Sequence, residues 1–287
     1  MSTSPGATRR MRFRSFYPGD VRAQLSHFLA GFEPPKGLPA TLRGAAVPHA
    51  GWRFSGGVAA RALRTLASRS QPTAILVFGA VHRERLHKSA VYAHGGWETP
   101  LETLAVAETL ADEVVSQLDA LAERNEAAHD SEHSIEVEMP ILGALFPGIP
   151  LVPIMVPPEA SPTELGSLLA RLVRGREVTA VASTDLTHYG APYGFLPAGT
   201  GEEALRWMRA NDHRMIHLAA RLEAESIPQE AKEHRNACGS GALAALAAFA
   251  REAGAASGTL LEHTTSHEVE HGTEPFTVAV GYAGMVF

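Results

Sequence analysis

The sequence contains only one cysteine, Cys238, among its 287 residues, which excludes an internal disulfide and gives no sign of an oxidising, secreted environment. It also lacks any apolar run approaching the roughly 20 residues that a membrane-spanning helix needs. The first residues, Met-Ser-Thr-Ser-Pro-Gly, are polar and lack the apolar core of a signal peptide. We therefore expect a cytoplasmic protein with no membrane association.

The chain also lacks a large excess of charge of either sign. Charged residues make up 20% of the chain, the formal net charge is −6, and lysine and arginine are scattered. This distribution gives no basic footprint for nucleic acid, so no nucleic-acid partner is expected. The densest basic run lies between Arg9 and Arg14, and we interpret it as part of a flexible, solvated N-terminal tail covering residues 1–15.

Strand and helix patterns alternate along the rest of the chain. Hydrophobic residues make up 45% of the sequence, enough for a sizeable core. The continuous apolar run 73–78 is typical of a strand buried on both faces, whereas the strand at 151–156 contains Pro153 and is expected at an edge or a bulge. The alternation predicts an α/β fold whose central sheet has helices on both faces. Because no linker interrupts the pattern, residues 16–287 are predicted to form a single domain.

The predicted elements follow from apolar periodicity and from glycine and proline boundaries. Strands are expected at 42–47, 73–78, 89–93, 151–156, 178–182, 259–261 and 276–282. Helices are expected at 21–29, 56–67, 104–121, 133–145, 162–174, 202–224 and 239–252, the fourth being interrupted or bent near Pro140.

Polar side chains follow three of the predicted strands directly. His49 follows the strand at 42–47, His82 follows the strand at 73–78, and Asp185 and His188 follow the strand at 178–182. In open α/β folds, ligands bind beyond the carboxyl ends of the strands. A single histidine in such a place is more often a loop residue, but three at equivalent positions favour one shared site.

Cys238 directly precedes the helix predicted over 239–252. The free N–H groups and partial positive charge of a helix N-terminus favour a thiolate, whereas the alternative interpretation is a buried, inert cysteine. Two imidazoles, from His49 and His82, and one thiolate would form a three-ligand metal site with open positions. Imidazole suits iron, copper and zinc, and thiolate favours softer metals, so this set predicts a reactive or exchangeable metal without naming it.

The segment 130–136, Asp-Ser-Glu-His-Ser-Ile-Glu, places His133 beside carboxylates. Glu132 or Glu136 could orient a histidine, as carboxylates do around metal sites. The alternative is that Asp130 or Ser131 caps a helix and the acids are exposed.

Two other histidine groups are interpreted as unrelated to metal binding. His213 and His217 are four residues apart in a predicted helix, but they lack the glutamate of a His-Glu-x-x-His motif, so a solvated helix face is favoured. His263, His267 and His271 also repeat every four residues, but the threonine, serine and glycine around them argue against a helix.

Taken together, the motifs resemble those of the Memo family, which includes bacterial proteins labelled AmmeMemoRadiSam system protein B. The shared segments are each short, but their order and spacing are specific. They are Phe16-Tyr17-Pro18 and the segments 47–52, 79–82, 97–101, 132–137, 183–189 and 238–239.

The resemblance implies a fold related to the class III extradiol dioxygenases, which hold non-haem Fe(II) with two histidines and a glutamate and cleave catechol rings. By this resemblance, His49 and His82 take the two histidine positions, and Cys238 replaces the carboxylate. His188 resembles the histidine that acts as acid or base in the dioxygenases. His133 and Asp185 would also line the pocket.

The resemblance therefore predicts a non-haem-iron oxidoreductase that acts on a small aromatic, catechol-like substrate, with Fe(II) as the expected metal and Cu or Zn as alternatives. The thiolate departs from the dioxygenase ligand set, and Gly79-Ala80-Val81-His82 differs from the Gly-Pro-Asn-His or Gly-Pro-Ser-His usual in the family. Two alternatives thus stay open: a non-catalytic ligand- or phosphopeptide-binding adaptor, and a copper- or iron-dependent redox protein. Whether the chain forms a homo-oligomer also stays open.

Overall fold

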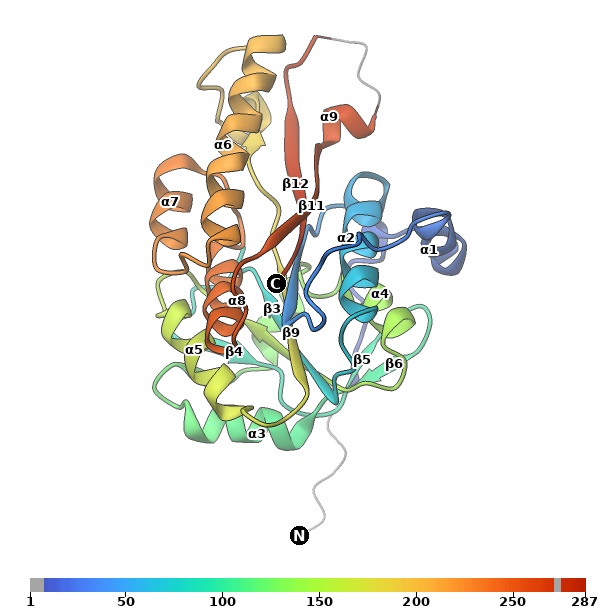
Figure 1. Ribbon diagram of the computed structural model, residues 1–287, viewed down its shortest axis with the longest axis vertical. Coiled ribbons are helices and arrows are strands. Elements are labelled where there is room, and N and C mark those ends of the chain that lie inside the picture. Colours follow the sequence, from blue (N-terminus) through green and yellow to red (C-terminus); the bar gives the residue numbers. More distant parts are fainter. Residues whose placement is uncertain (1–7, 271–274) are drawn as a thin grey trace.

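The computed structural model describes residues 8–270 and 275–287, and its centre is a large mixed sheet with helices on both faces (Figure 1). Within the described residues, the main sheet has nine strands. They are β2 (Gly44–Val47), β3 (Ala74–Gly79), β4 (Ser89–Val91), β7 (Ala122–Arg124), β8 (Leu151–Met155), β9 (Val178–Ser183), β10 (His188–Tyr189), β11 (Thr259–Thr265) and β12 (Ala279–Val286). Their order is β10-β12-β2-β9-β3-β8-β4-β7, and β11 pairs with β12. A smaller sheet joins β1 (Thr8–Arg9), β5 (Gly96–Glu98) and β6 (Thr103–Ala105).

The helices form two layers around the main sheet. They are α1 (Val21–Leu29), α2 (Trp52–Ala67), α3 (Glu108–Gln117), α4 (Met139–Leu145), α5 (Pro162–Leu172), α6 (Glu202–Ala220), α7 (Ile227–His234), α8 (Ser240–Glu252) and α9 (Ser266–Val269). On one face, α2 packs against β2 and β12 and is joined by α1 and α4 (Figure 1). On the other face, α8 packs against β2, β3 and β9, and α5, α6 and α7 pack on α8. The predicted α/β class, with one domain and helices on both faces, is confirmed.

The four central strands position the candidate site. Neighbouring pairs β2–β9, β9–β3 and β3–β8 are all parallel, so their carboxyl ends lie at one edge of the sheet. Val47 at the end of β2 is in register with Ser183 at the end of β9, and Phe78 of β3 is in register with Ala182. Loops that leave these strands therefore begin side by side. The strands are buried along nearly their whole length, as expected for parallel strands covered on both faces.

The prediction that Pro153 marks an edge or a bulge is wrong, because β8 lies between β3 and β4. The carbonyl oxygen of Pro153 accepts the N–H of Tyr92 at 2.9 Å, just beyond the last residue of β4. The backbone nitrogen and oxygen of one strand residue point to the same side. The missing N–H of the proline therefore faces the end of a very short strand, where the loss of one donor is tolerated.

The N-terminal segment also differs from the solvated tail expected from its basic residues. Residues 1–7 lie outside the described part of the chain, but Thr8–Arg9 pairs with β5, and Arg9 is only 4% exposed. The guanidinium of Arg9 binds the carboxylate of Glu136 at 2.5 Å and lies 4.2 Å above the ring of Trp97. Because a buried charge needs a buried partner of opposite sign, Arg9 belongs to the folded domain.

Two predicted helices are shorter than expected. The pattern at 104–121 begins as strand β6, and only its second part is the helix α3. The pattern at 133–145 begins with turns, and α4 starts at Met139 with Pro140 in its first turn. There the proline costs no helical hydrogen bond, so it starts the helix instead of bending it.

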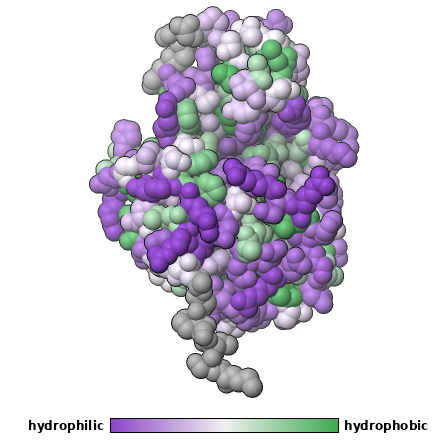
Figure 2. Space-filling view, turned by 180° about the vertical axis from the view of Figure 1, so that it is seen from behind, coloured by the Kyte–Doolittle hydropathy of each residue, from purple (hydrophilic) through white to green (hydrophobic). Residues whose placement is uncertain are grey.

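The face of the molecule opposite to that of Figure 1 carries mainly hydrophilic residues, with hydrophobic ones in small separate groups (Figure 2). Among the helices in the described residues, none is long and apolar enough to cross a membrane.

Candidate metal centre

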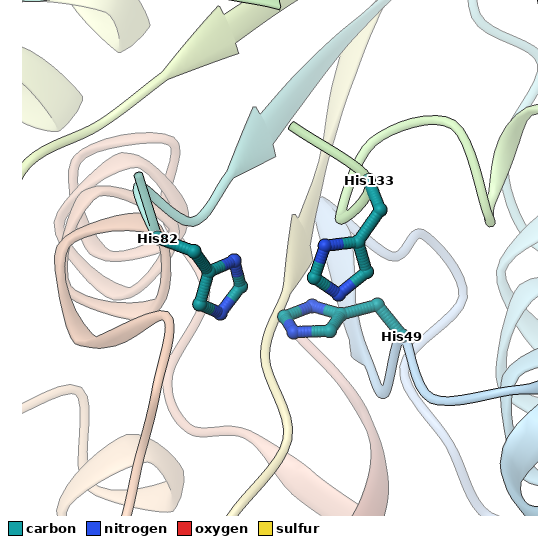
Figure 3. Close-up of side chains that lie close together, drawn as sticks. All are labelled: His49, His82 and His133. Atoms are coloured by element: carbon teal, nitrogen blue, oxygen red, sulfur yellow. The ribbon is translucent and has the colours of Figure 1, made fainter. Parts of the chain in front are cut away.

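Three histidine side chains from three loops meet beyond the carboxyl ends of the central strands (Figure 3). His49 follows β2, His82 follows β3, and His133 lies in the turns before α4. The ring centroid of His49 is 5.2 Å from that of His82 and 5.2 Å from that of His133, and the last two are 4.8 Å apart. One ring nitrogen from each histidine lies within 4.8 Å of the other two, which is close enough to hold one metal ion.

Cys238 and Asp185 approach the same cluster from the other loops. The Cys238 Sγ atom lies 3.2 Å from His49 Nε2, and Asp185 Oδ2 lies 4.0 Å from the same nitrogen. These three residues form a second group whose ligand atoms all lie within 4.8 Å of one another. The thiol also interacts with His82, whose pKa it raises. His49 therefore belongs to both ligand groups, one with His82 and one with Cys238, and metal ligation by His49, His82 and Cys238 together stays a prediction.

Hydrogen bonds fix the orientation of the two predicted histidine ligands. His49 Nδ1 is 2.9 Å from the hydroxyl of Ser183, and that hydroxyl donates to the carbonyl of Ser134 at 2.8 Å. The hydroxyl therefore accepts the Nδ1–H of His49, which leaves Nε2 as the free nitrogen. His82 Nδ1 is 2.9 Å from Glu132 Oε1 and donates to it. A metal-binding histidine is oriented in this way by a hydrogen bond at its second nitrogen.

Two glutamates of the 130–136 segment have different partners. Glu132 accepts the N–H groups of His82, His133 and Ser134 as well as the ring of His82, which confirms that it orients a histidine. Glu136 instead accepts bonds from the N-terminal segment. Its donors are the Arg9 guanidinium, the N–H groups of Arg12 and Phe13, and the Tyr17 hydroxyl. The two acids therefore tie the histidine loops and the N-terminal segment into one structure.

The N-terminal segment also contributes an aromatic wall. The rings of Phe13 and Phe16 pack on the ring of His133, with centroids 5.8 Å and 4.7 Å from it. Both phenylalanines are half-buried. Sequence reasoning missed this wall because Phe13 and His133 are far apart along the chain and residues 1–15 were assigned to a tail.

Burial determines the charge of the two neutral histidines. Burial, together with the charges of His82 and His133, lowers the pKa of His49 well below its usual value. Burial likewise lowers the pKa of His133 to about 4. Both rings are therefore neutral near pH 7, the form in which imidazole binds metals.

His82 and Glu132 behave as a charged pair. Burial lowers the pKa of His82, but hydrogen bonds with Cys238 and Glu132 outweigh burial and raise that pKa to about 10. Burial raises the pKa of Glu132, but the hydrogen bond and charge of His82 hold it well below its usual range. In the metal-free protein His82 is protonated, and metal binding must displace that proton.

The thiolate expected for Cys238 is not the form that the metal-free protein favours. Burial and the charge of Asp185 raise the pKa of the thiol, although α8 begins two residues later and His82 acts in the opposite direction. Desolvation of the anion therefore outweighs the opposing effect of His82. As for His82, a bound metal would release this proton.

His188 follows Asp185 on the segment after β9. Its Nδ1 atom is 3.1 Å from the carbonyl oxygen of Leu186, and its ring centroid is 5.1 Å from that of Tyr193. Asp185 is buried and accepts the backbone N–H of His49 at 2.8 Å. Burial raises the pKa of Asp185, and the charge of His188 acts in the opposite direction.

The other histidines have partners that explain them without a metal. His263 Nε2 bonds Asp212 Oδ2 at 2.9 Å, and the ring of His213 packs on that of His263. His217 is exposed, and His271 lies outside the described residues. Within residues 8–270 and 275–287, none of these histidines belongs to a metal-ligand group.

Cys238 also lines a surface cavity of about 430 Å³. The cavity lies between α7 and the loop after β8, and its other lining residues include Pro158, Glu159, Gln229 and Lys232. Cys238 therefore borders both the histidine cluster and this cavity.

Comparisons with known proteins show the family to which the chain belongs. A family model described as "Memo-like protein" matches residues 14–286. A MEMO1 family protein of Thermococcus kodakarensis is 31% identical over 285 residues, covering 95% of this chain and 96% of that one. A MEMO1 family protein of Pyrococcus furiosus is 32% identical over 284 residues, covering 94% of this chain and 95% of that one. The chain belongs to the Memo family.

A solved structure of an uncharacterized protein from Escherichia coli K12 is also similar. It is 16% identical in sequence, with a TM-score of 0.49, and the match covers 84% of this chain and 99% of that one.

Proposed function

We propose that the chain binds one metal ion through His49, His82 and Cys238 and acts as an Fe(II)-dependent oxidoreductase on a small aromatic substrate. The observation that carries this proposal is the 3.2 Å approach of Cys238 Sγ to His49 Nε2, next to an imidazole of His82 whose other nitrogen is bound to Glu132. The free nitrogen of His49 thus faces the thiol, and a ring nitrogen of His82 lies within 4.8 Å of one of His49.

The donor set fits a reactive metal. Two imidazoles and one thiol suit iron, copper or zinc, and three protein ligands leave positions open for small molecules. The resemblance to extradiol dioxygenases supports Fe(II) among these metals. Bound Fe(II) would supply the redox and Lewis-acid chemistry that activates dioxygen towards an aromatic diol.

An aromatic substrate is supported by the wall of Phe13 and Phe16 beside His133. Aromatic rings favour tilted or offset contacts with other rings, and both rings of this wall already make tilted contacts with His133 of the histidine cluster. Because the wall belongs to the N-terminal segment, that segment would take part in substrate selection.

His188 is the residue that we assign to proton transfer. Its Nδ1–H donates to the carbonyl oxygen of Leu186, which leaves Nε2 free to accept a proton from a hydroxyl of the substrate and to return it later. Asp185, three residues before it, accepts the backbone N–H of His49 and so connects the loop after β9 with the loop after β2.

The test is oxygen uptake by the anaerobically Fe(II)-loaded protein with a series of catechols. His188→Gln should lower turnover by about 10²-fold or more, as loss of a general acid or base does, while iron content stays unchanged. His217→Gln, at an exposed position of α6, is the matched control and should leave turnover unchanged.

Three results would contradict parts of this proposal. Full activity of His188→Gln would exclude its proton-transfer role. Iron-loaded protein that consumes no oxygen with any catechol would favour the non-catalytic binding protein. Catechol-independent formation of superoxide or peroxide that is lost in Cys238→Ser would favour the redox protein.

A further inference from the structure

The loop that carries Asp185 and His188 is held by two residues of α6. The Asp212 Oδ1 atom accepts the backbone N–H of Thr187 at 2.9 Å, and Asn211 Nδ2 donates to the Thr187 hydroxyl at 3.1 Å. Thr187 is fully buried. Both the backbone and the side chain of the residue next to His188 are therefore fixed by neighbouring residues of one helix.

Strand β12 holds the same loop from another direction. The carbonyl of Gly281 accepts the N–H of Leu186 at 2.8 Å, and its N–H donates to the carbonyl of Thr187 at 2.9 Å. A Cβ atom at Gly281 would lie 2.1 Å from Asp212 Oδ2, so only glycine lets the helix carboxylate approach so closely. Residues 186–187 are thus clamped between Gly281 and Asp212.

The second oxygen of the Asp212 carboxylate is bound by His263 of β11. Asp212 is fully buried, and His263 Nε2 lies 2.9 Å from its Oδ2 atom while the His263 side chain is 9% exposed. Burial of a charged carboxylate is costly unless it is hydrogen-bonded, and His263 binds the oxygen that Thr187 leaves free. The ring of His213 packs on the other side of this pair.

The clamp reaches His188 by two routes. Thr187 precedes His188 along the backbone, and Leu186 supplies the carbonyl that accepts the Nδ1–H of His188. A shift of residues 186–187 would therefore move both the backbone of His188 and the acceptor that determines its ring orientation. We propose that Asp212 and His263 form a positioning pair for His188, an inference that rests on the proton-transfer role given to His188 under the proposed function.

The experiment uses the full chain with Asp212→Ala, Asp212→Asn and His263→Ala. The readout is the ring carbon and proton resonances of His188 in the metal-free protein, assigned from their loss in His188→Gln, together with iron content and kcat after loading. We expect Asp212→Ala and His263→Ala to move the His188 resonances and lower kcat about tenfold or more, with unchanged iron content. Asp212→Asn keeps an acceptor for the N–H of Thr187 and should leave the His188 resonances as in the wild type. His213→Gln, which changes only the packing ring, is the control.

A folded His263→Ala protein whose His188 resonances match the wild type would overturn the proposal, even if its melting temperature falls. If Asp212→Ala does not fold, His263→Ala decides alone, because the His263 side chain is 9% exposed whereas that of Asp212 is fully buried. The His188 resonances are measured without metal or substrate. Absence of catechol turnover in the wild type would therefore count against the proposed function, while the His188 signals still decide whether the pair positions that ring.

Discussion

Replacement of Glu132 by glutamine keeps the shape of the side chain but changes one acceptor into a donor. In the native protein, four N–H groups converge on this carboxylate: the backbone and Nδ1 groups of His82 and the backbone groups of His133 and Ser134. In either orientation the new amide group faces at least one of these donors. A buried donor without a partner costs about 1–3 kcal/mol, so the folded state should lose stability by about that amount.

The larger effect of Glu132→Gln should fall on the metal. The carboxylate orients His82, and loss of such a partner lowers metal affinity by about 10–100-fold, or about 1.4–2.8 kcal/mol. Anaerobic competition titration of Zn(II) against a chromophoric chelator measures this change. Glu225→Gln, in an exposed pair with Arg251, is the control and should bind as the wild type does. An affinity within twofold of the wild type for Glu132→Gln would refute the argument that Glu132 prepares His82 for a metal.

Two further predictions concern stability. Arg9→Met would leave the buried carboxylate of Glu136 without its cation and should lower the free energy of unfolding, measured in urea titrations, by about 3–5 kcal/mol. Arg10→Met, in an exposed pair, should lower it by less than about 1 kcal/mol. Equal effects of the two substitutions would contradict the structural role of the N-terminal segment. Burial lowers the pKa of His129 from 6.5 to about 3. Below pH 6.5 this imidazole is therefore protonated in the unfolded chain, whereas in the native protein it stays neutral down to about pH 3. Stability present at neutral pH is therefore lost as the pH falls through this window, by up to about 1.4 kcal/mol per pH unit. His129→Gln can still donate to the carbonyl of Ala90, and its free energy of unfolding should fall less steeply with decreasing pH. An unchanged slope would exclude His129 as the source of this pH dependence.

The position of the site could be predicted because it depends on local patterns. Apolar runs followed by His49, His82 and Asp185 mark strand ends, and parallel strands bring their carboxyl ends to one edge. Cys238 was predicted from its place before an apolar, alanine-rich helix. Each of these inferences needed only a short segment of sequence and a general rule of α/β folds.

Features that depend on distant contacts could not be predicted in the same way. Arg9 looks like a tail residue until Glu136, far along the chain, is seen to bury it. Pro153 looks like an edge residue until the length of the neighbouring strand is known. The charge of Cys238 depends on how much protein surrounds it, and burial raises the pKa of its thiol, which the sequence does not reveal.

His133 illustrates the same limit at the site itself. From the sequence it was a pocket-lining residue, whereas its ring lies as near to His49 as the ring of His82 does. Its segment gave no strand-end signal, because it follows turns instead of a strand of the sheet. We therefore regard His133 as a further candidate ligand, and spectroscopy of the metal can distinguish it from Cys238.

The central claim is that Cys238 and the two histidines bind the metal, and X-ray absorption at the zinc edge of protein loaded with one equivalent of Zn(II) tests it most directly. The account predicts one sulfur neighbour at about 2.3 Å and nitrogen neighbours at about 2.0–2.1 Å, with the sulfur lost in Cys238→Ser. A wild-type spectrum with nitrogen and oxygen neighbours and no sulfur would contradict it and leave the cluster of His49, His82 and His133 as the ligand set.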